Sequence, residues 1–333
     1  MASGPAPQSR LEKVWYGGRT AGPGLRLLSL LYGMLQMLHR SVSRLFAGHP
    51  GVPVIVVGNI TVGGTGKTPL VARITELLQQ ADLRVGIVSR GYRSSAGAGP
   101  VFVSDSSVAA SVGDEPLMLR RLTGAPVAVG SKRLRVARAL VARHGLDVLV
   151  SDDGLQHHRL GRDLEIAVVD GQRRLGNGLM LPAGPLREPP RRLARVDYVV
   201  TNGGEALGQE VPMALIPGPA RNLVTGGRRE LGSFADAPVV AVAAIGNPGR
   251  FFDMLEDLGL QVEPKPFPDH HRFSARDVNG WADRTVLVTE KDAVKLSGLA
   301  GSSWWVVPVM ADLPDEFEQQ LVARVKTMTR ENR

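Results

Sequence analysis

The chain has 333 residues, of which 43% are hydrophobic and 22% are charged, and its formal net charge at pH 7 is +8. This balance is typical of a globular protein with a sizeable core and excludes a largely disordered chain. Cysteine is absent, which excludes disulfides, thiolate metal ligands and cysteine nucleophiles, while the excess of basic residues predicts a polyanionic partner such as nucleic acid, anionic lipid or a phosphorylated substrate.

A first helix is predicted over Leu25–Phe46, where polar or small residues recur at steps of three and four in an otherwise apolar sequence. The residues of this stripe are Arg26, Ser29, Gly33, Gln36, Arg40 and Ser43. The apolar run Leu27–Leu38 is shorter than the roughly 20 residues that span a bilayer, and no secretory signal is expected before it. Two interpretations stay open: a core helix, or an interfacial helix lying among membrane headgroups.

From Val52 onward, short β-branched runs alternate with helical patterns, which predicts a doubly wound, mostly parallel α/β sheet. The predicted strands are Pro53–Val57, Arg84–Ser89, Pro126–Gly130, Asp147–Ser151, Glu165–Asp170 and Asp197–Thr201. Helices are predicted over Thr68–Gln80 and Lys132–His144. The stretch Leu181–Arg192 is rich in proline, glycine and arginine and is expected to be a functional loop.

A second, smaller α/β unit is predicted after this sheet. Strand Pro238–Ile245 leads into helix Arg250–Leu258, and strand Thr285–Thr289 leads into helix Glu290–Leu296. We therefore expect three segments: an N-terminal segment over residues 1–48, a nucleotide-binding and catalytic domain over 49–220, and a smaller subdomain over 221–333.

A glycine-rich loop follows the first strand and leads into a helix, which is the setting of a phosphate-binding loop. The residues expected to bind the nucleotide are Thr61, Val62, Gly63, Gly64, Thr65, Gly66, Lys67 and Thr68. In this pattern backbone N–H groups surround the phosphates, the lysine reaches the terminal phosphates and the Thr68 hydroxyl ligates Mg²⁺. Thr61 replaces the first glycine of the strict pattern, and Val62 replaces the signature lysine of partition-type ATPases, which disfavours an ATP-driven switch.

Several acidic and histidine side chains are candidates for phosphoryl-transfer chemistry. Asp152 and Asp153 follow an apolar strand at the carboxyl end, where a Mg²⁺-organising carboxylate is expected. Asp114 precedes a helix expected to begin near Leu117, so it is either an N-terminal cap or a catalytic group. The segment 267–273 concentrates titratable groups that could exchange protons near neutral pH.

The motifs GGTGKTP, SRGYR, GDEP, DDGLQHHRL, LPAGPLRE, PDHHRF and TEKDAVKL occur in one order along nearly the whole chain. In this combination the chain resembles the tetraacyldisaccharide 4'-kinase family of lipid A biosynthesis. The resemblance implies transfer of the ATP γ-phosphate to the 4'-hydroxyl of an acylated glucosamine disaccharide 1-phosphate, giving lipid IVA. It also implies a peripheral location at the cytoplasmic face of the bacterial inner membrane.

The resemblance also implies roles for individual residues, matched motif by motif. Lys67 and Thr68 would serve the phosphates and Mg²⁺, and Asp152 and Asp153 would organise the metal. Asp114 would act as the base, with His270 tuning or relaying its proton. Further active-site polar residues would be Arg133, Arg187 and Glu188.

Two other functions are weighed against this one. A membrane-associated nucleotide-switch ATPase would hydrolyse ATP slowly and bind a partner rather than phosphorylate lipid. A nucleic-acid kinase is disfavoured because no stretch interleaves basic and aromatic residues. We expect a monomer that uses ATP and Mg²⁺, binds an acylated disaccharide lipid and the membrane surface, and binds no nucleic acid.

Overall fold

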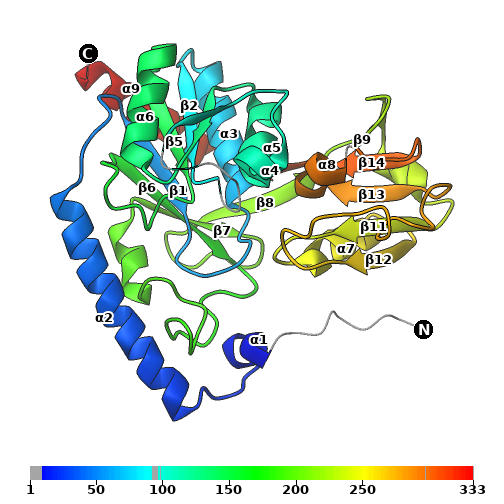
Figure 1. The fold of residues 1–333 in the computed structure, drawn as a ribbon, viewed down its shortest axis with the longest axis horizontal. Helices are drawn as coiled ribbons and strands as arrows, with labels where there is room; N and C mark the ends of the chain where they lie inside the picture. The colour runs from blue at the N-terminus through cyan, green and yellow to red at the C-terminus, as the bar shows by residue number, and fades with distance from the viewer. Residues whose placement is uncertain (1–9, 92–96, 98, 297, 333) are drawn as a thin grey trace. The chain divides into compact units, whose positions relative to one another are not determined.

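The computed structural model describes residues 10–91, 97, 99–296 and 298–332. They form two compact units, a smaller one over Ile216–Met310 and a larger one made of the described residues on either side of it (Figure 1). The chain passes from one unit to the other within strands β8 (Val211–Pro217) and β15 (Val309–Asp312).

The larger unit contains most of a nine-stranded sheet with the strand order β15-β8-β7-β6-β1-β5-β2-β4-β3. Its remaining strands are β1 (Val54–Gly58), β2 (Val85–Ser89), β3 (Val101–Val103), β4 (Val127–Val129), β5 (Val148–Asp152), β6 (Leu164–Asp170) and β7 (Tyr198–Asn202). The pairings from β8 through β4 are parallel, and β3 pairs antiparallel with β4 at the edge. The predicted doubly wound, mostly parallel α/β class is therefore confirmed.

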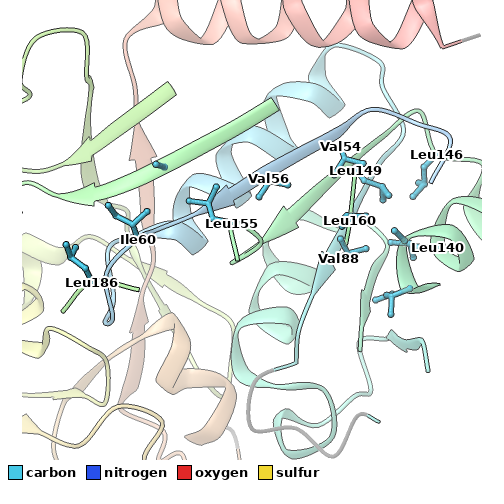
Figure 2. Close-up of a cluster of buried hydrophobic side chains, with 14 residues drawn as sticks. Val54, Val56, Ile60, Val88, Leu140, Leu146, Leu149, Leu155, Leu160 and Leu186 are labelled. Carbon is cyan, nitrogen blue, oxygen red and sulfur yellow. The ribbon is translucent and has the colours of Figure 1, made fainter. Parts of the chain in front are cut away.

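Helices cover both faces of this sheet. They are α3 (Lys67–Gln80), α4 (Ala109–Val112), α5 (Asp114–Thr123), α6 (Arg133–His144) and α9 (Asp315–Glu331), beside the N-terminal α1 (Arg10–Trp15) and α2 (Pro23–Leu45) and a 3₁₀ turn, η1 (Pro190–Arg195). Val54 and Val56 of β1 face a cluster that includes Leu140 of α6, as Figure 2 shows. Ile55 and Val57 point the other way and are fully buried as well, on the side where α3 packs.

The core reaches the carboxyl end of β1, where the glycine-rich loop begins. Ile60, Leu155 and Leu186 belong to the same buried cluster as the strand residues and lie beside or beyond the end of the strand (Figure 2). Three loops are thus anchored in one apolar cluster, which fixes the backbone on which the polar side chains of the site stand.

The smaller unit has its own sheet, with the order β10-β9-β14-β13-β11-β12. Its elements are β9 (Ala220–Asn222), β10 (Arg228–Arg229), η2 (Leu231–Phe234), β11 (Val239–Ala243), α7 (Pro248–Asp257), β12 (Val262–Pro266), β13 (Val286–Thr289), α8 (Glu290–Leu296) and β14 (Trp304–Val307). Its central pairings are parallel, and β9 and β10 are antiparallel. Two apolar clusters, one around Phe251 and one around Trp304, form its core.

Helix α2 turns most of its polar stripe toward the protein and its apolar side chains toward the solvent, while Arg26 of the stripe is exposed. Ser29 and Ser43 are its buried residues, and the Ser29 hydroxyl donates to the Met180 carbonyl at 2.8 Å. Its exposed side chains include Leu27, Leu28, Leu30, Leu31, Met34, Leu35, Met37, Leu38, Val42 and Leu45. The interpretation of this segment as a core helix is wrong, because a core helix would bury these residues.

Candidate phosphate-binding and catalytic site

The glycine-rich loop runs from Asn59 to Gly66, between β1 and α3. Gly63 and Gly66 have φ angles of 106° and 87°, which favour glycine. At Gly66 a Cβ atom would also lie 2.2 Å from the side-chain nitrogen of Asn202. The loop is therefore shaped around backbone that only glycine fits, and it leads into the N-terminus of α3, where N–H groups and the helix dipole favour an anion.

Lys67 is the first residue of α3, and its side chain turns back over the loop. Its ammonium nitrogen lies 3.2 Å from Asn59 Oδ1 and 3.6 Å from Asp153 Oδ1. Arg187 Nη1 lies 3.3 Å from Asp153 Oδ2. Two cations thus share one carboxylate beside the glycine loop.

Asp152 and Asp153 stand at the carboxyl end of β5, where Asp152 is level with Val57 of the neighbouring β1. Asp152 is buried; its Oδ2 accepts from the Ser89 hydroxyl at 3.3 Å, and its Oδ1 has no hydrogen-bond partner among the described residues. Burial, and then the negative charges of Glu115 and Asp153, raise the pKa of Asp152 to about 7. Although burial alone would raise the pKa of Asp153, Lys67 and Arg187 lower it to about 2.

Arg133 begins α6 directly behind this acidic pair. Its guanidinium is buried and donates to the Asp152 carbonyl at 3.3 Å and to the Gly130 carbonyl at 3.4 Å. Burial lowers the pKa of Arg133 to about 10, so the side chain is still positive at neutral pH. The positive charge of Arg133 therefore partly offsets the negative charge of Asp152 and Asp153.

The segment that carries Arg187 and Glu188 lies along the glycine loop. Arg187 N–H donates to the Ile60 carbonyl at 2.7 Å, and Val62 N–H donates to the Pro185 carbonyl at 2.9 Å. Glu188 is buried, accepts from Gln156 Nε2 at 2.8 Å and lies 3.3 Å from Arg192. The loop predicted over Leu181–Arg192 thus supports the backbone of the glycine-rich loop. Glu188 contacts Gln156 and Arg192.

Two polar residues of this arrangement, Asn59 and Gln156, were not assigned a role from the sequence. Gln156 Nε2 donates to both the Asn59 carbonyl and Glu188, and its Oε1 lies 3.4 Å from Arg187 Nη1. Its position just after DDGL was an available signal. For Asn59 the only signal is its place at the end of the first strand.

A model of the tetraacyldisaccharide-1-P 4'-kinase family matches residues 22–326. The chain belongs to this family. A tetraacyldisaccharide 4'-kinase of Shewanella halifaxensis is 46% identical over 323 residues, covering 96% of this chain and 98% of its own. Another, of Alkalilimnicola ehrlichii, is 50% identical over 311 residues, covering 92% and 94%.

Among solved structures, the kinase fold of this family is represented by LpxK from Aquifex aeolicus in complex with ATP. It matches with a TM-score of 0.75 and 28% sequence identity, covering 90% of this chain and 97% of that one. The α/β architecture of this 4'-kinase family member is thus shared with a protein that binds ATP.

In this 4'-kinase family member, Asp114 does not serve as the N-terminal cap of a helix beginning near Leu117. Helix α5 begins at Asp114 itself, and its N-cap is Gly113. Gly113 has a φ of 95°, a conformation that favours glycine and turns the chain sharply before Asp114. The capping interpretation is therefore wrong.

His270 belongs to the smaller unit, in the loop between β12 and β13. Its φ is 60°, its Nε2 lies 3.3 Å from Lys291 Nζ, and Lys291 donates to Asp269 at 3.1 Å. The neighbouring His271 stacks on Phe267 and lies 3.4 Å from Asp277. The two vicinal histidines therefore have separate surroundings, and only His270 joins a cluster of charged groups.

Proposed function

We propose that the chain transfers the γ-phosphate of ATP to the 4'-hydroxyl of a tetraacylated glucosamine disaccharide 1-phosphate, giving lipid IVA. Membership of the tetraacyldisaccharide 4'-kinase family supports this reaction, as does the ATP complex of the similar LpxK. The observation that carries it is the glycine loop with Lys67 turned over it and two carboxylates beside it. Such an arrangement binds a polyphosphate and neutralises the charge of the transferred phosphoryl group.

Mg²⁺ would be held by Thr68, Asp152 and Asp153. Two observations fit a bound cation. Oδ1 of Asp152 has no hydrogen-bond partner among the described residues, so it can serve as a ligand. The low pKa of Asp153 keeps its carboxylate charged at neutral pH. In the described ranges no group of three or more histidine or acidic side chains could hold a metal alone. Phosphate oxygens would have to complete the coordination, as Mg²⁺ in phosphoryl-transfer sites commonly requires, and the ion would supply charge neutralisation.

Asp114 is proposed as the base that orients and deprotonates the sugar hydroxyl. The turn at Gly113 places it at the start of α5, next to Glu115, which acts electrostatically on Asp152. His270 is proposed to tune or relay the proton of Asp114. The charged neighbours of His270, Lys291 and Asp269, support an electrostatic role for the ring.

Helix α2 is proposed to lie in the headgroup region of the cytoplasmic face of the inner membrane. Its exposed leucine and methionine side chains would enter the apolar boundary, and Arg26 and Arg44 near its ends would meet anionic headgroups. No helix in the described part of the chain is long and apolar enough to traverse a bilayer. A monomer that lies on the membrane surface would meet its lipid substrate there.

The test is incubation with Mg²⁺, ATP labelled in its γ-phosphate, and the acylated disaccharide 1-phosphate in mixed micelles. A kinase moves the label onto the lipid, whereas a nucleotide switch releases it slowly as phosphate. The switch is not favoured, because the relatives are kinases. Labelled phosphate with no labelled lipid would overturn the proposed reaction. A double variant, Thr68→Ala with Asp152→Asn, tests the proposed metal residues: its activity should require a higher concentration of Mg²⁺.

A further inference from the structure

Asn59 is a fully buried side chain that contacts the phosphate-loop lysine. It follows β1 directly, and its Oδ1 lies 3.2 Å from Lys67 Nζ. An ammonium group can only donate, so the amide oxygen must be the atom that faces it. This contact fixes the orientation of the whole amide, and its nitrogen therefore points the other way.

The amide nitrogen of Asn59 contacts the opposite side of the same loop. Nδ2 lies 3.4 Å from the Gly63 carbonyl and 3.4 Å from the Thr61 hydroxyl. The main-chain carbonyl of Asn59 accepts from Gln156 at 3.0 Å, which ties the residue to the acidic side of the site. One buried amide thus connects the lysine to the glycine backbone that surrounds the phosphates.

Only a neutral amide combines these contacts. A carboxylate would still attract the lysine, but it has no donor for the Gly63 carbonyl and would place a further negative charge near incoming phosphates. An apolar side chain would leave the ammonium with its ion pair to Asp153, 3.6 Å away, and without a neutral acceptor. A neutral acceptor holds the lysine without cancelling its charge, and phosphate oxygens can replace it when nucleotide binds.

We propose that Asn59 is a positioning residue that holds Lys67 over the phosphate loop before nucleotide binds. The proposal rests on the phosphate-binding role proposed for Lys67. Holding the ammonium in place lowers the cost of ordering a flexible side chain during binding, so Asn59 acts on ATP through Lys67 and not by contact with the acceptor sugar.

The test is a double-mutant cycle between Asn59→Ala and Lys67→Met, measured as kcat/KM for ATP with thermal unfolding of each variant. Loss of a hydrogen bond to a charged group predicts a fall on the order of tenfold or more for Asn59→Ala. Asn59→Asp should fall further, because its charge repels phosphate. In the Lys67→Met background Asn59→Ala should change little, since the partner through which it acts is gone.

The matched control is Asn202→Ala, which removes a second buried amide that contacts the glycine loop, from the end of β7. Asn202 donates to the Thr65 carbonyl at 3.0 Å, a hydrogen bond to the loop backbone that does not involve Lys67, so its effect should add to that of Lys67→Met. Should Asn59→Ala fail to fold, Asn59→Ser replaces it in the cycle. The inference is overturned if the effects of the Asn59 and Lys67 substitutions are additive, or if an Asn59 variant has normal kcat/KM. A Lys67→Met protein with normal kcat/KM would instead overturn the proposed role of the lysine itself.

Discussion

The ammonium nitrogen of Lys67 lies 3.6 Å from one oxygen of Asp153, and Arg187 lies 3.3 Å from the other. A single carboxylate, about one-third exposed, therefore holds two cations beside the glycine loop. Arrival of a polyphosphate would offer both cations stronger partners and leave Asp153 free to face a metal ion. The ion pairs keep the three side chains together beside the glycine loop.

Replacing Lys67 by methionine should abolish most of the ATP affinity. The ammonium is the proposed contact to the terminal phosphates, and loss of one charged hydrogen-bonding group costs about 1.5–3 kcal/mol or more, which is on the order of 10- to 100-fold in binding. Equilibrium titration with ATP and Mg²⁺ measures the change. Lys326→Met, in α9, is the control and should bind ATP normally; equal affinities of the two variants would remove Lys67 from the site.

Replacing Arg187 by lysine should not preserve activity. Nη1 of the guanidinium reaches both Asp153 and Gln156, at 3.3 and 3.4 Å. The ammonium of lysine is on a shorter side chain, is more strongly hydrated and lacks the planar shape that places this nitrogen between the two partners. We expect kcat/KM to fall on the order of tenfold or more, as for loss of a charged hydrogen bond. Arg191→Lys, on an exposed arginine of η1, is the matched change; a similar loss there would show that the effect is general and not tied to Arg187.

Replacing Asp114 by asparagine should lower kcat and spare ATP binding. General-base catalysis contributes typically ~10²- to 10⁴-fold, and asparagine keeps the size of the side chain while removing the proton acceptor. Single-turnover phosphorylation of the lipid and an ATP titration separate the two effects. Asp236→Asn, on an exposed loop residue, should behave as the unchanged protein; near-normal turnover of the Asp114 variant would exclude the base role.

The ion pair between Glu210 and Arg174 should make stability depend on pH in the acidic range. A side-chain hydrogen bond from Arg174 at 2.7 Å, opposed by burial and aided by Leu207 N–H and Thr201, lowers the pKa of Glu210 to about 2. Because the pKa of Glu210 is lower in the folded state, its charged form stabilises the fold at pH values above the unfolded-state pKa of 4.5. This contribution is lost as the pH falls toward 2. The folded state thus binds fewer protons than the unfolded state in this window.

Glu210→Gln should therefore cost about 1–2 kcal/mol of unfolding free energy at pH 7, a figure reduced for solvent screening of a partly exposed pair. The difference from the unchanged protein should shrink as pH falls from 5 to 3, because the unfolded chain binds a proton at Glu210 over this range while the folded state stays charged. Urea unfolding at several pH values measures it. Glu205→Gln, at an exposed carboxylate in the same loop, is the control, and a pH-independent difference would contradict the assignment.

The strand, glycine loop and helix around Lys67 could be predicted because their signals are local. Buried β-branched residues and glycines at fixed spacing determine the elements, and the predicted bounds of α3 and β1 differ from the observed ones by one residue. Parallel strands then bring Asp152 beside β1 without further information.

Non-local contacts decide the rest of the site, and the sequence carries little signal for them. The buried Glu188 contacts Gln156 and Arg40, which lie far from it in the sequence. The same holds for the direction of α2, since an amphipathic helix has two faces, and contacts such as those of Ser29 and Arg40 show which face meets the protein. Helix α9 likewise returns to the larger unit through Glu318, whose carboxylate pairs with Arg73 of α3 at 2.7 Å.

The exposed apolar face of α2 should be required for binding to membranes but not for folding. Leu31, Leu35 and Leu38 are 44%, 67% and 61% exposed, so replacing all three by glutamate removes no core packing. Each fully buried leucine contributes roughly 1.5–3 kcal/mol, and the triple variant should therefore lose on the order of 100-fold or more in affinity for vesicles of anionic phospholipid. Sedimentation with vesicles measures this, and thermal unfolding should be unchanged.

Leu258→Glu is the control for adding charge at an exposed leucine outside α2. Phosphorylation of substrate dispersed in detergent micelles separates membrane binding from catalysis. If α2 only brings the enzyme to the membrane, the triple variant keeps its ATP affinity and loses activity mainly on vesicle-bound substrate, since Ser29 and Arg40 still fix the helix to the segment that carries Arg187 and Glu188. Vesicle binding equal to that of the Leu258 variant would show that this face of α2 does not bind the membrane.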